Sequence, residues 1–248
     1  MDPWLPPSGE TIELPTFWIL PQSGYEGVVV NIPEMRLYYF PPRDKGMTQR
    51  TVVTLPVGLG REDWPTPVAK FKIRGKTPNP VWVIPESIKK ERIADKGWTE
   101  NFIPAGSPDN PMGKYRIDLT LPLYAIHDTN NPWAVGRLVT HGCIRLYPED
   151  IEQLFDVIRI GSPGELVYEP VKIGVLYGKV YVEVHEDIYK LIPDLWEEAQ
   201  KVVRESGWAD MIDQTLLTKA LMEKSGVPTD VTKGSKIKRF GETAAAEL

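Results

Sequence analysis

The chain has 248 residues, of which 42% are hydrophobic and 25% are charged, and its formal net charge is −5. These values are typical of a globular protein with a sizeable core, and they give no indication of a nucleic-acid-binding surface. The single cysteine excludes an intramolecular disulfide framework and a four-cysteine zinc site, and no apolar run is long enough to span a membrane.

The first half of the chain predicts short strands separated by turns, in keeping with the 24 prolines and 20 glycines of the whole sequence. Residues 1–24 are expected to form a loop with one short strand. Strands are then predicted in the segments GVVVNI, MRLYYF, RTVVTLPVGLG, AKFKIRGK and VWVIPESI, the last of which ends on a short helix through Lys90. The stretch from Gly58 to Gly60 is too short for a dinucleotide-binding fingerprint and is interpreted as a turn.

The second half adds helices to the strands. The segment GKYRIDLTLPLYAIHD predicts one or two strands that carry His127 at their end, and YPEDIEQLFDVI has the apolar spacing of a helix with proline at its start. Residues 170–185 predict a hairpin, and two amphipathic helices that end at Gly207 and Gly226 are expected to follow. Residues 227–248 are expected to be a mobile tail. The chain is therefore predicted to be mainly β, with a helical C-terminal extension.

The only cysteine, Cys143, lies two residues after His141 and two before Arg145. It has three interpretations. Free cysteines are often buried packing residues, or His127, His141 and Cys143 could be three ligands of a metal site. The third interpretation is a nucleophile. The polar surroundings favour it, as does a turn before a helix, where backbone N–H groups and the helix dipole favour a thiolate.

A nucleophilic cysteine would have the groups that its chemistry needs nearby. A thiol is mostly protonated at neutral pH, and His127 at the end of its strand could return to Cys143 and accept that proton. A tight turn at Gly142 would aim backbone N–H groups at one point, where they could hold the oxyanion of a tetrahedral intermediate. The guanidinium of Arg145 has a fork of donors that suits a substrate carboxylate.

The segment IHDTNNPWAVGRLVTHGCIRLYPEDI resembles the signature of the L,D-transpeptidase catalytic domain, also called the YkuD domain. That signature is a histidine, a short loop and then Ser/Thr-His-Gly-Cys-hydrophobic-Arg/Asn. The segments GVVVNIPEMRLYYF, VGLGREDWPTPVAKFKI, NPVWVIPESI and AGSPDNPMGKYRIDL also resemble the periplasmic enzymes that link lipoprotein to peptidoglycan. The resemblance covers about residues 27–168 and implies a YkuD-like β-sandwich or barrel with short helices.

The resemblance also implies roles for individual residues. Cys143 would be the nucleophile and His127 the general base, with its ring oriented by the backbone carbonyl of Asp128. The remaining implied residues are His141 and Gly142, which with Cys143 supply the oxyanion pocket, and Arg145, Asp128 and Thr140, which belong to the substrate-binding site. Two positions depart from the family, because Asp128 and Ala69 stand where it usually has glycine.

The implied donor is a tetrapeptide stem of peptidoglycan, which is cleaved before its terminal D-alanine to leave a thioester. An amine of a second stem would then give a 3→3 cross-link, and an amine of an outer-membrane lipoprotein or another protein would attach that protein to the wall. Water as the acceptor would make the enzyme an L,D-carboxypeptidase. The resemblance implies no metal or organic cofactor, and it implies that a carbapenem acylates Cys143.

Three regions are expected: a remnant of a LysM-like wall-binding module or a linker over residues 1–24, the catalytic domain over 25–168, and a hairpin with helices over 169–248. The start of the chain has neither a charged nor an apolar targeting region. Because the implied substrate lies outside the cytoplasmic membrane, the protein is expected to be periplasmic, with a signal segment missing from this chain. A non-catalytic peptidoglycan-binding protein with a degenerate site is the alternative from another functional class.

Overall fold

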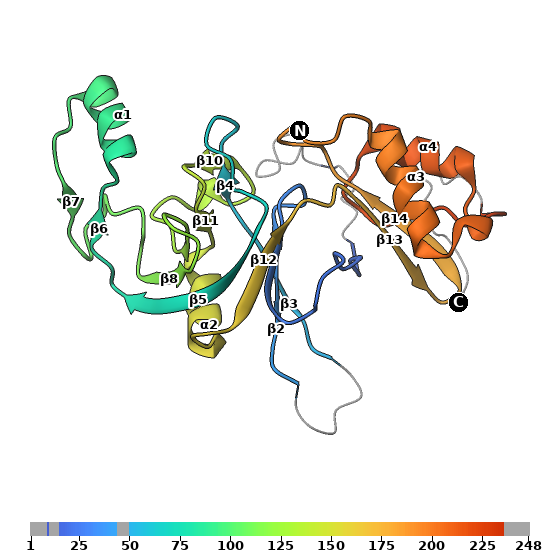
Figure 1. Ribbon diagram of the computed structural model, residues 1–248, viewed down its shortest axis with the longest axis horizontal. Coiled ribbons are helices and arrows are strands. Elements are labelled where there is room, and N and C mark those ends of the chain that lie inside the picture. The colour runs from blue at the N-terminus through green and yellow to red at the C-terminus, as the bar shows by residue number, and fades with distance from the viewer. Residues whose placement is uncertain (1–8, 10–14, 44–49, 236–248) are drawn as a thin grey trace. The chain divides into compact units, whose positions relative to one another are not determined.

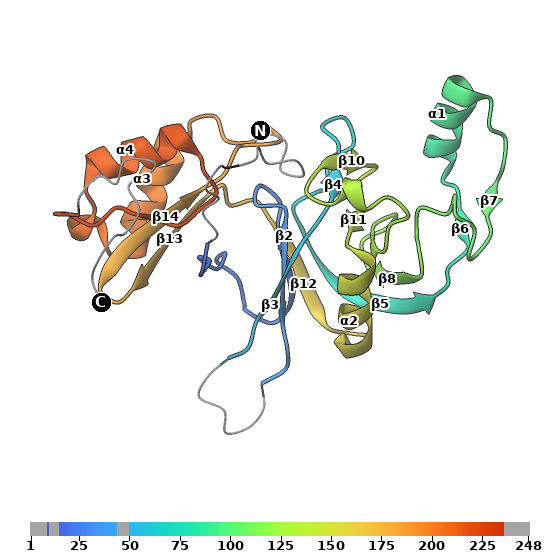
Figure 2. The ribbon, with the colours of Figure 1, turned by 180° about the vertical axis from the view of Figure 1, so that it is seen from behind.

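The computed structural model describes residues 9, 15–43 and 50–235, and the chain divides into two compact units. The larger unit consists of Pro21–Glu169 and Asp187–Leu191, and the smaller unit takes its described residues from Met1–Leu20, Pro170–Glu186 and Ile192–Leu248. Figure 1 shows the elements of each unit, and Figure 2 shows them from behind. Within the described ranges, none of the helices combines the length and the apolar character that a membrane span needs.

The larger unit is built on an eight-stranded sheet in the order β11-β9-β8-β5-β12-β1-β2-β3. Its strands are β1 (Gly27–Asn31), β2 (Arg36–Phe40), β3 (Val53–Pro56), β5 (Ala69–Pro78), β8 (Tyr115–Leu119), β9 (Ala125–His127), β11 (Ile144–Arg145) and β12 (Pro163–Val167). The chain that follows β3 reaches β11, because Gly58 and Arg145 exchange two backbone hydrogen bonds of 2.9 Å. The sheet is therefore curled, and the predicted mainly β fold with short helices is confirmed.

The sequences of two strands explain their places in the sheet. All five residues of β1, GVVVN, are buried, and the strand pairs with β12 on one side and β2 on the other. A strand that is covered on both faces has a continuous apolar run. In β8 the pattern alternates, since Ile117 and Leu119 are buried while Arg116 and Asp118 are only half-buried. The charged pair therefore lies on the face away from the core.

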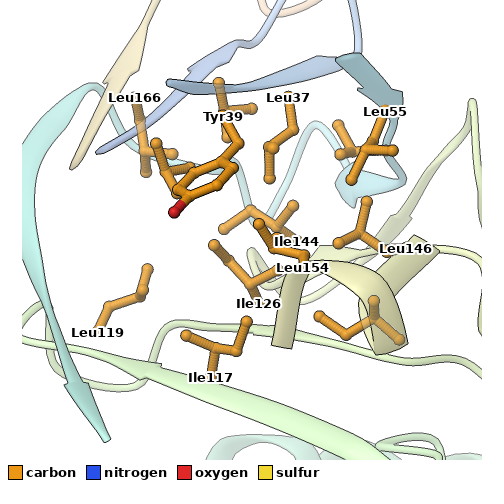
Figure 3. Close-up of a cluster of buried hydrophobic side chains, with 14 of the residues drawn as sticks. Leu37, Tyr39, Leu55, Ile117, Leu119, Ile126, Ile144, Leu146, Leu154 and Leu166 are labelled. Carbon is orange, nitrogen blue, oxygen red and sulfur yellow. The ribbon is translucent and has the colours of Figure 1, made fainter. Parts of the chain in front are cut away.

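The core of the larger unit lies between this sheet and helix α2 (Pro148–Val157). Figure 3 shows Ile126 of β9, Ile144 of β11 and Leu154 of α2 among its labelled side chains, and all three are almost fully buried. As predicted, α2 has proline at its start. Truncation of a core isoleucine to alanine costs about 2–5 kcal/mol, so this packing fixes the backbones of β9 and β11.

Between β5 and β8 the chain leaves the sheet and forms β6 (Trp82–Val83), α1 (Glu86–Lys96) and β7 (Phe102–Ile103) (Figure 1). Strands β6 and β7 pair with each other. This excursion has a small core of its own, made of Trp82, Ile84, Ile103 and Met112. The predicted short helix is present but extends beyond Lys90, and it ends where Gly97 adopts the left-handed conformation.

The smaller unit contains the predicted hairpin and helices, namely β13 (Val171–Leu176), β14 (Lys179–Val184), α3 (Leu195–Ser206), the 3-10 turn η2 (Ala209–Met211) and α4 (Gln214–Glu223). Tyr177 and Gly178 at the tip of the hairpin have φ of 50° and 76°, which is the pattern of a type I′ turn. Helix α3 ends before Gly207, as predicted, whereas α4 ends at a left-handed Lys224 rather than at Gly226.

The prediction of a mobile tail from residue 227 was wrong for residues 227–235. Strand β15 (Thr229–Asp230) pairs with β14, and Val231 beside it is fully buried. A single apolar residue in a polar stretch has no periodicity that would predict a strand. The rest of the predicted tail, residues 236–248, lies outside the described residues.

The N-terminal segment contributes to the smaller unit through Ile19. Its N–H donates to the carboxylate of Glu183, and its carbonyl accepts from Lys172 Nζ at 2.6 Å. Lys172 and Glu183 form a buried ion pair of 2.7 Å. Most of the predicted LysM-like remnant, residues 1–8 and 10–14, lies outside the described residues, and residues 15–24 contain no strand. The assignment to such a module stays a prediction.

Candidate active site

Strands β9 and β11 carry three of the predicted site residues or directly adjoin them. They pair in parallel, with Ile126 opposite Ile144 and His127 opposite Arg145. Successive strand residues point to opposite faces. Because the two isoleucines point into the core, His127 and Arg145 share the other face, and Cys143 comes directly before β11.

Strand β4 (Leu59–Gly60) lines the other side of Cys143 and corrects the predicted turn. It pairs in parallel with β10 (Leu138–Thr140), and Gly58 bridges to Arg145. A Cβ on Gly58 would lie 2.1 Å from the Ala134 carbonyl oxygen, and one on Gly60 would lie 2.9 Å from the Gly142 Cα. These glycines permit close backbone packing rather than a turn.

His127 is buried, with 1% of its surface exposed. Its Nδ1 lies 2.5 Å from the Asp128 carbonyl oxygen. A carbonyl can only accept, so Nδ1 carries the hydrogen and the lone pair of the neutral ring is on Nε2. Burial, reinforced by the charge of Arg145, lowers the pKa of His127 to about 3. The ring is therefore neutral at pH 7 and able to accept a proton.

This pKa predicts how the stability of the protein depends on pH. The unfolded chain protonates its histidine near pH 6.5, whereas the folded pKa is about 3. Between these values the unfolded state binds the extra proton, so the free energy of unfolding falls as the pH is lowered. His127 is expected to lower the free energy of unfolding by about 2–3 kcal/mol when the pH falls from about 6.5 to about 4.5.

Urea unfolding of the wild type and of His127→Gln at about pH 7 and pH 4.5 measures this contribution. Carboxylates titrate in both proteins, so the quantity of interest is the difference between their two pH dependences. A loss of stability that is equally steep in the variant would contradict a buried neutral His127.

Cys143 is half-buried, and its thiol lies 3.6 Å from the Leu123 carbonyl oxygen. Burial raises the pKa of Cys143, against a hydrogen bond from Ala125 and the charges of Arg116 and Arg145. The expectation that a helix lowers this pKa was wrong, because β11 separates the cysteine from α2. The resting site therefore pairs a neutral thiol with a neutral imidazole, and the proton must move during attack.

Two guanidinium groups lie near the thiol. The Nε of Arg145 is buried and has no hydrogen-bond partner among the described residues. A buried unpaired donor is costly, and a carboxylate is the ligand that a guanidinium best accommodates. Arg116, opposite His127 on β8, pairs with Asp118 at 2.9 Å. The sequence prediction missed Arg116, although the alternation of YRIDL separates it from the core.

Thr140 and Gly142 shape the turn that carries Cys143. Thr140 Oγ1 accepts from the Gly142 N–H at 3.0 Å and donates to the Cys143 carbonyl at 2.7 Å. Gly142 has φ +99°, and a Cβ there would lie 2.5 Å from the Tyr124 ring. Thr140 is almost fully buried, which favours a positioning role over direct contact with a substrate. The Gly142 N–H is engaged, so the oxyanion would have to bind to the other predicted donors.

His141 lies in a separate network. Its Nε2 donates to Glu91 of α1 at 2.6 Å, and the same carboxylate pairs with Arg61 at 2.8 Å. The hydrogen bond from His141 lowers the pKa of Glu91. Among the described residues, His127, His141 and Cys143 do not bring their ligand atoms close enough to share one ion. Sequence reasoning missed Glu91 and Arg61, since neither lies near the motif in sequence.

Asp128, which departs from the family pattern, holds a neighbouring loop. Its buried carboxylate accepts from the N–H groups of Thr129 at 2.6 Å and Lys114 at 2.8 Å. Gly113 has φ +59°, and a Cβ there would lie 2.3 Å from the Asp128 carboxyl group. These bonds favour a role in fixing the backbone that orients His127 over contact with a substrate. Ala69, the other departure, begins β5 and lies opposite Leu166, away from these residues.

Comparisons with known proteins identify the family of this chain. The family model of the L,D-transpeptidase catalytic domain, YkuD, matches residues 26–173. "Probable L,D-transpeptidase ErfK/SrfK" from Salmonella typhimurium is 35% identical over 247 residues, which cover 94% of this chain and 76% of that protein. "Probable L,D-transpeptidase YbiS" from Escherichia coli is 36% identical over 239 residues, covering 92% and 75%. With the model matching more than half of its length, this chain belongs to the YkuD family of L,D-transpeptidase enzymes.

Proposed function

We propose that this enzyme transfers the acyl group of a peptidoglycan tetrapeptide stem through a thioester on Cys143. The observation that carries the proposal is the face shared by β9 and β11. There His127, whose imidazole is neutral, lies opposite Arg145, whose Nε has no partner among the described residues, and Cys143 directly precedes Ile144 of β11 and feels the charge of Arg145. These are the nucleophile, the base and the carboxylate-binding group that acyl transfer from a peptide requires.

The first half of the reaction forms the thioester. Cys143 Sγ attacks the carbonyl carbon between the L-centre of diaminopimelate and the terminal D-alanine, and its proton passes to His127 Nε2. The C–N bond then breaks, and His127 returns the proton to the leaving amine of D-alanine. The bond from Nδ1 to the Asp128 carbonyl keeps the ring oriented through both transfers.

Backbone donors would stabilise the oxyanion that forms during attack. The Gly142 N–H is engaged by Thr140, so we assign the oxyanion to the N–H of Cys143, with the His141 N–H as the second donor. Oriented backbone donors need no reorganisation when charge develops, which makes them effective in a buried site.

The second half transfers the acyl group to an acceptor amine, which loses its proton to His127 as the thiolate of Cys143 leaves. An amine of another stem gives a 3→3 cross-link, and an amine of a lipoprotein or other protein attaches that protein to the wall. Water in place of the amine gives L,D-carboxypeptidase activity. Because peptidoglycan lies outside the cytoplasmic membrane, we further propose that the protein acts in the periplasm.

The test is incubation with purified tetrapeptide muropeptides, with products identified by mass spectrometry. Both reactions are expected to release one D-alanine from each donor. Transpeptidation then gives a dimer that lacks one of its two D-alanines, whereas carboxypeptidase activity gives the tripeptide. If the muropeptides bind but D-alanine is never released, the protein is a wall-binding module and the proposed function is wrong.

Arg145→Lys is expected to lower kcat/KM for the muropeptide roughly tenfold to a hundredfold, because a charge-assisted hydrogen bond contributes about 1.5–3 kcal/mol. Lysine retains the charge but presents a point ammonium in place of the planar fork. The measurement is the rate of D-alanine release as a function of substrate concentration. Arg137→Lys is the matched control, since Arg137 is an exposed arginine directly before β10. Equal kcat/KM in both variants would reduce Arg145 to a general electrostatic role.

A further inference from the structure

Residues 187–191 belong to the larger unit, although they follow the hairpin of the smaller one. They also lie beyond residues 26–173, which the family model matches. Ile188 and Tyr189 pack against the core of the larger unit. This short segment therefore adds core contacts to the larger unit from outside the region that the family model matches.

The hydroxyl of Tyr189 makes two hydrogen bonds to the loop that leads from β4 to β5. It donates to the Gly60 carbonyl at 2.6 Å and accepts from the Thr66 N–H at 3.2 Å. One hydroxyl proton serves one acceptor, so these two bonds have a fixed direction. Burial raises the pKa of Tyr189, and the phenol therefore stays protonated at neutral pH.

Thr66 continues this chain of hydrogen bonds to the catalytic turn. Its Oγ1 accepts from the Gly60 N–H at 3.0 Å and donates to the Gly142 carbonyl at 2.9 Å. Thr66 is 2% exposed, so water does not compete for these bonds. Tyr189, Gly60, Thr66 and Gly142 thus form a continuous path to the residue before the nucleophile.

The path ends at the peptide group that contains the proposed oxyanion donor, the Cys143 N–H. The carbonyl of Gly142 and the N–H of Cys143 belong to one peptide group, which is planar and trans. Fixing the direction of that carbonyl therefore fixes the direction of the Cys143 N–H, on the opposite side. Thr66 holds the carbonyl, and Tyr189 holds Thr66.

The segment that carries Tyr189 is itself fixed. Tyr168 donates to the Asp187 carboxylate and accepts from the Tyr189 N–H at 2.8 Å. The rings of Tyr168 and Tyr189 stack with centroids 6.1 Å apart. Asp187 also accepts from the Leu191 N–H at 2.9 Å. The hydroxyl of Tyr189 is therefore held in place before any substrate binds.

We propose that Tyr189 is a positioning residue that acts through Thr66 to aim the Cys143 N–H at the oxyanion. The inference rests on the proposed function, because it assigns that N–H to the tetrahedral intermediate. It makes residues 187–191 part of the catalytic apparatus, although they do not touch the reacting atoms.

The test compares two reactions of the same thiol. Acylation by a carbapenem passes through an oxyanion, whereas alkylation by iodoacetamide does not. Tyr189→Phe, which keeps the stacked ring, is expected to slow acylation about tenfold, less than the roughly 10²–10³-fold that follows loss of a whole oxyanion donor. Alkylation is expected to stay within about twofold of the wild type, because formation of the thiolate does not depend on this N–H.

Variants at the other end of the path provide an independent check. Thr66→Val is expected to give the same selective defect, and Thr66→Ser, which retains the hydroxyl, is expected to restore acylation. The double variant Tyr189→Phe with Thr66→Val should be no slower than the slower single variant, since both break one path. Tyr177→Phe is the matched control, because Tyr177 is 96% exposed at the tip of the hairpin.

Equal loss of acylation and alkylation in Tyr189→Phe would mean a general structural role and would overturn the inference. Unchanged acylation would overturn it as well. If the wild type were not acylated, or if Cys143→Ala were acylated equally fast, the proposed function would fail and the inference with it. A selective loss of acylation that appears in Thr66→Val but not in Tyr189→Phe overturns the inference and leaves the proposed function standing.

Discussion

Cys143→Ala is expected to abolish release of D-alanine from muropeptides while the protein remains folded. No other thiol exists in the chain, and a neighbouring hydroxyl is a much weaker nucleophile at neutral pH. Cys143 is half-buried in a turn, so loss of its sulfur is expected to change the free energy of unfolding by about 1 kcal/mol or less.

Two measurements on the same preparation separate catalysis from folding. Mass spectrometry of the products gives activity, and the urea midpoint gives stability. Leu123→Ala is a useful control, because Leu123 is 83% exposed beside the thiol and contributes only its carbonyl to the contact. Retained turnover in Cys143→Ala would eliminate the cysteine mechanism, and a protein that unfolds outright would support a packing role for this residue.

Local sequence signals predicted those elements whose pattern depends on a few neighbouring residues. The hairpin around Tyr177 carries turn residues, and the helix that begins at Pro148 has proline at its first position. The segment GKYRIDLTLPLYAIHD predicted one or two strands that carry His127 at their end, and β8 and β9 are there. The resemblance to a known family supplied the roles of individual residues, which neither periodicity nor composition could assign.

Contacts between distant segments could not be predicted in this way. Gly58 and Gly60 have the composition of a turn, yet Gly60 belongs to β4 and Gly58 bridges to Arg145, at positions where other backbones approach too closely for a side chain. The bond from Glu91 to His141 spans 50 residues, and the one from Tyr189 to Thr66 spans 123. Such pairs depend on the curled sheet and on the excursion from it, which single-sequence patterns do not specify.

The raised pKa of Cys143 could not be predicted from the sequence either. A short segment before a helix favoured a thiolate, but β11 lies between the half-buried cysteine and α2. The pKa of a thiol depends on what surrounds it in space, and burial outweighs the neighbouring arginines here. A base is therefore needed at the moment of attack.

His127→Gln is expected to slow acylation of Cys143 by a carbapenem roughly 10²–10⁴-fold, the usual contribution of a general base. The thiol is neutral at rest because its pKa is raised, so it reacts slowly unless its proton is accepted during attack. The lactam carbonyl gives the same tetrahedral intermediate as the stem peptide. Ring opening breaks the lactam C–N bond but leaves the amine attached to the acyl group, so no D-alanine departs and the thioester is expected to persist.

Intact-mass measurement over time follows this reaction, and it is expected to show one drug per chain on the peptide that contains Cys143. Since the pKa of His127 is held at about 3, the ring stays unprotonated at pH 5, and wild-type acylation is expected to lose little of its rate between about pH 7 and pH 5. An ordinary histidine base would lose most of its activity over that range. His141→Gln is the matched comparison, because His141 is held by Glu91 rather than by the Asp128 carbonyl. If His141→Gln were the slow variant and His127→Gln reacted as fast as the wild type, the base would be His141 and the thiol would be activated from the side of α1.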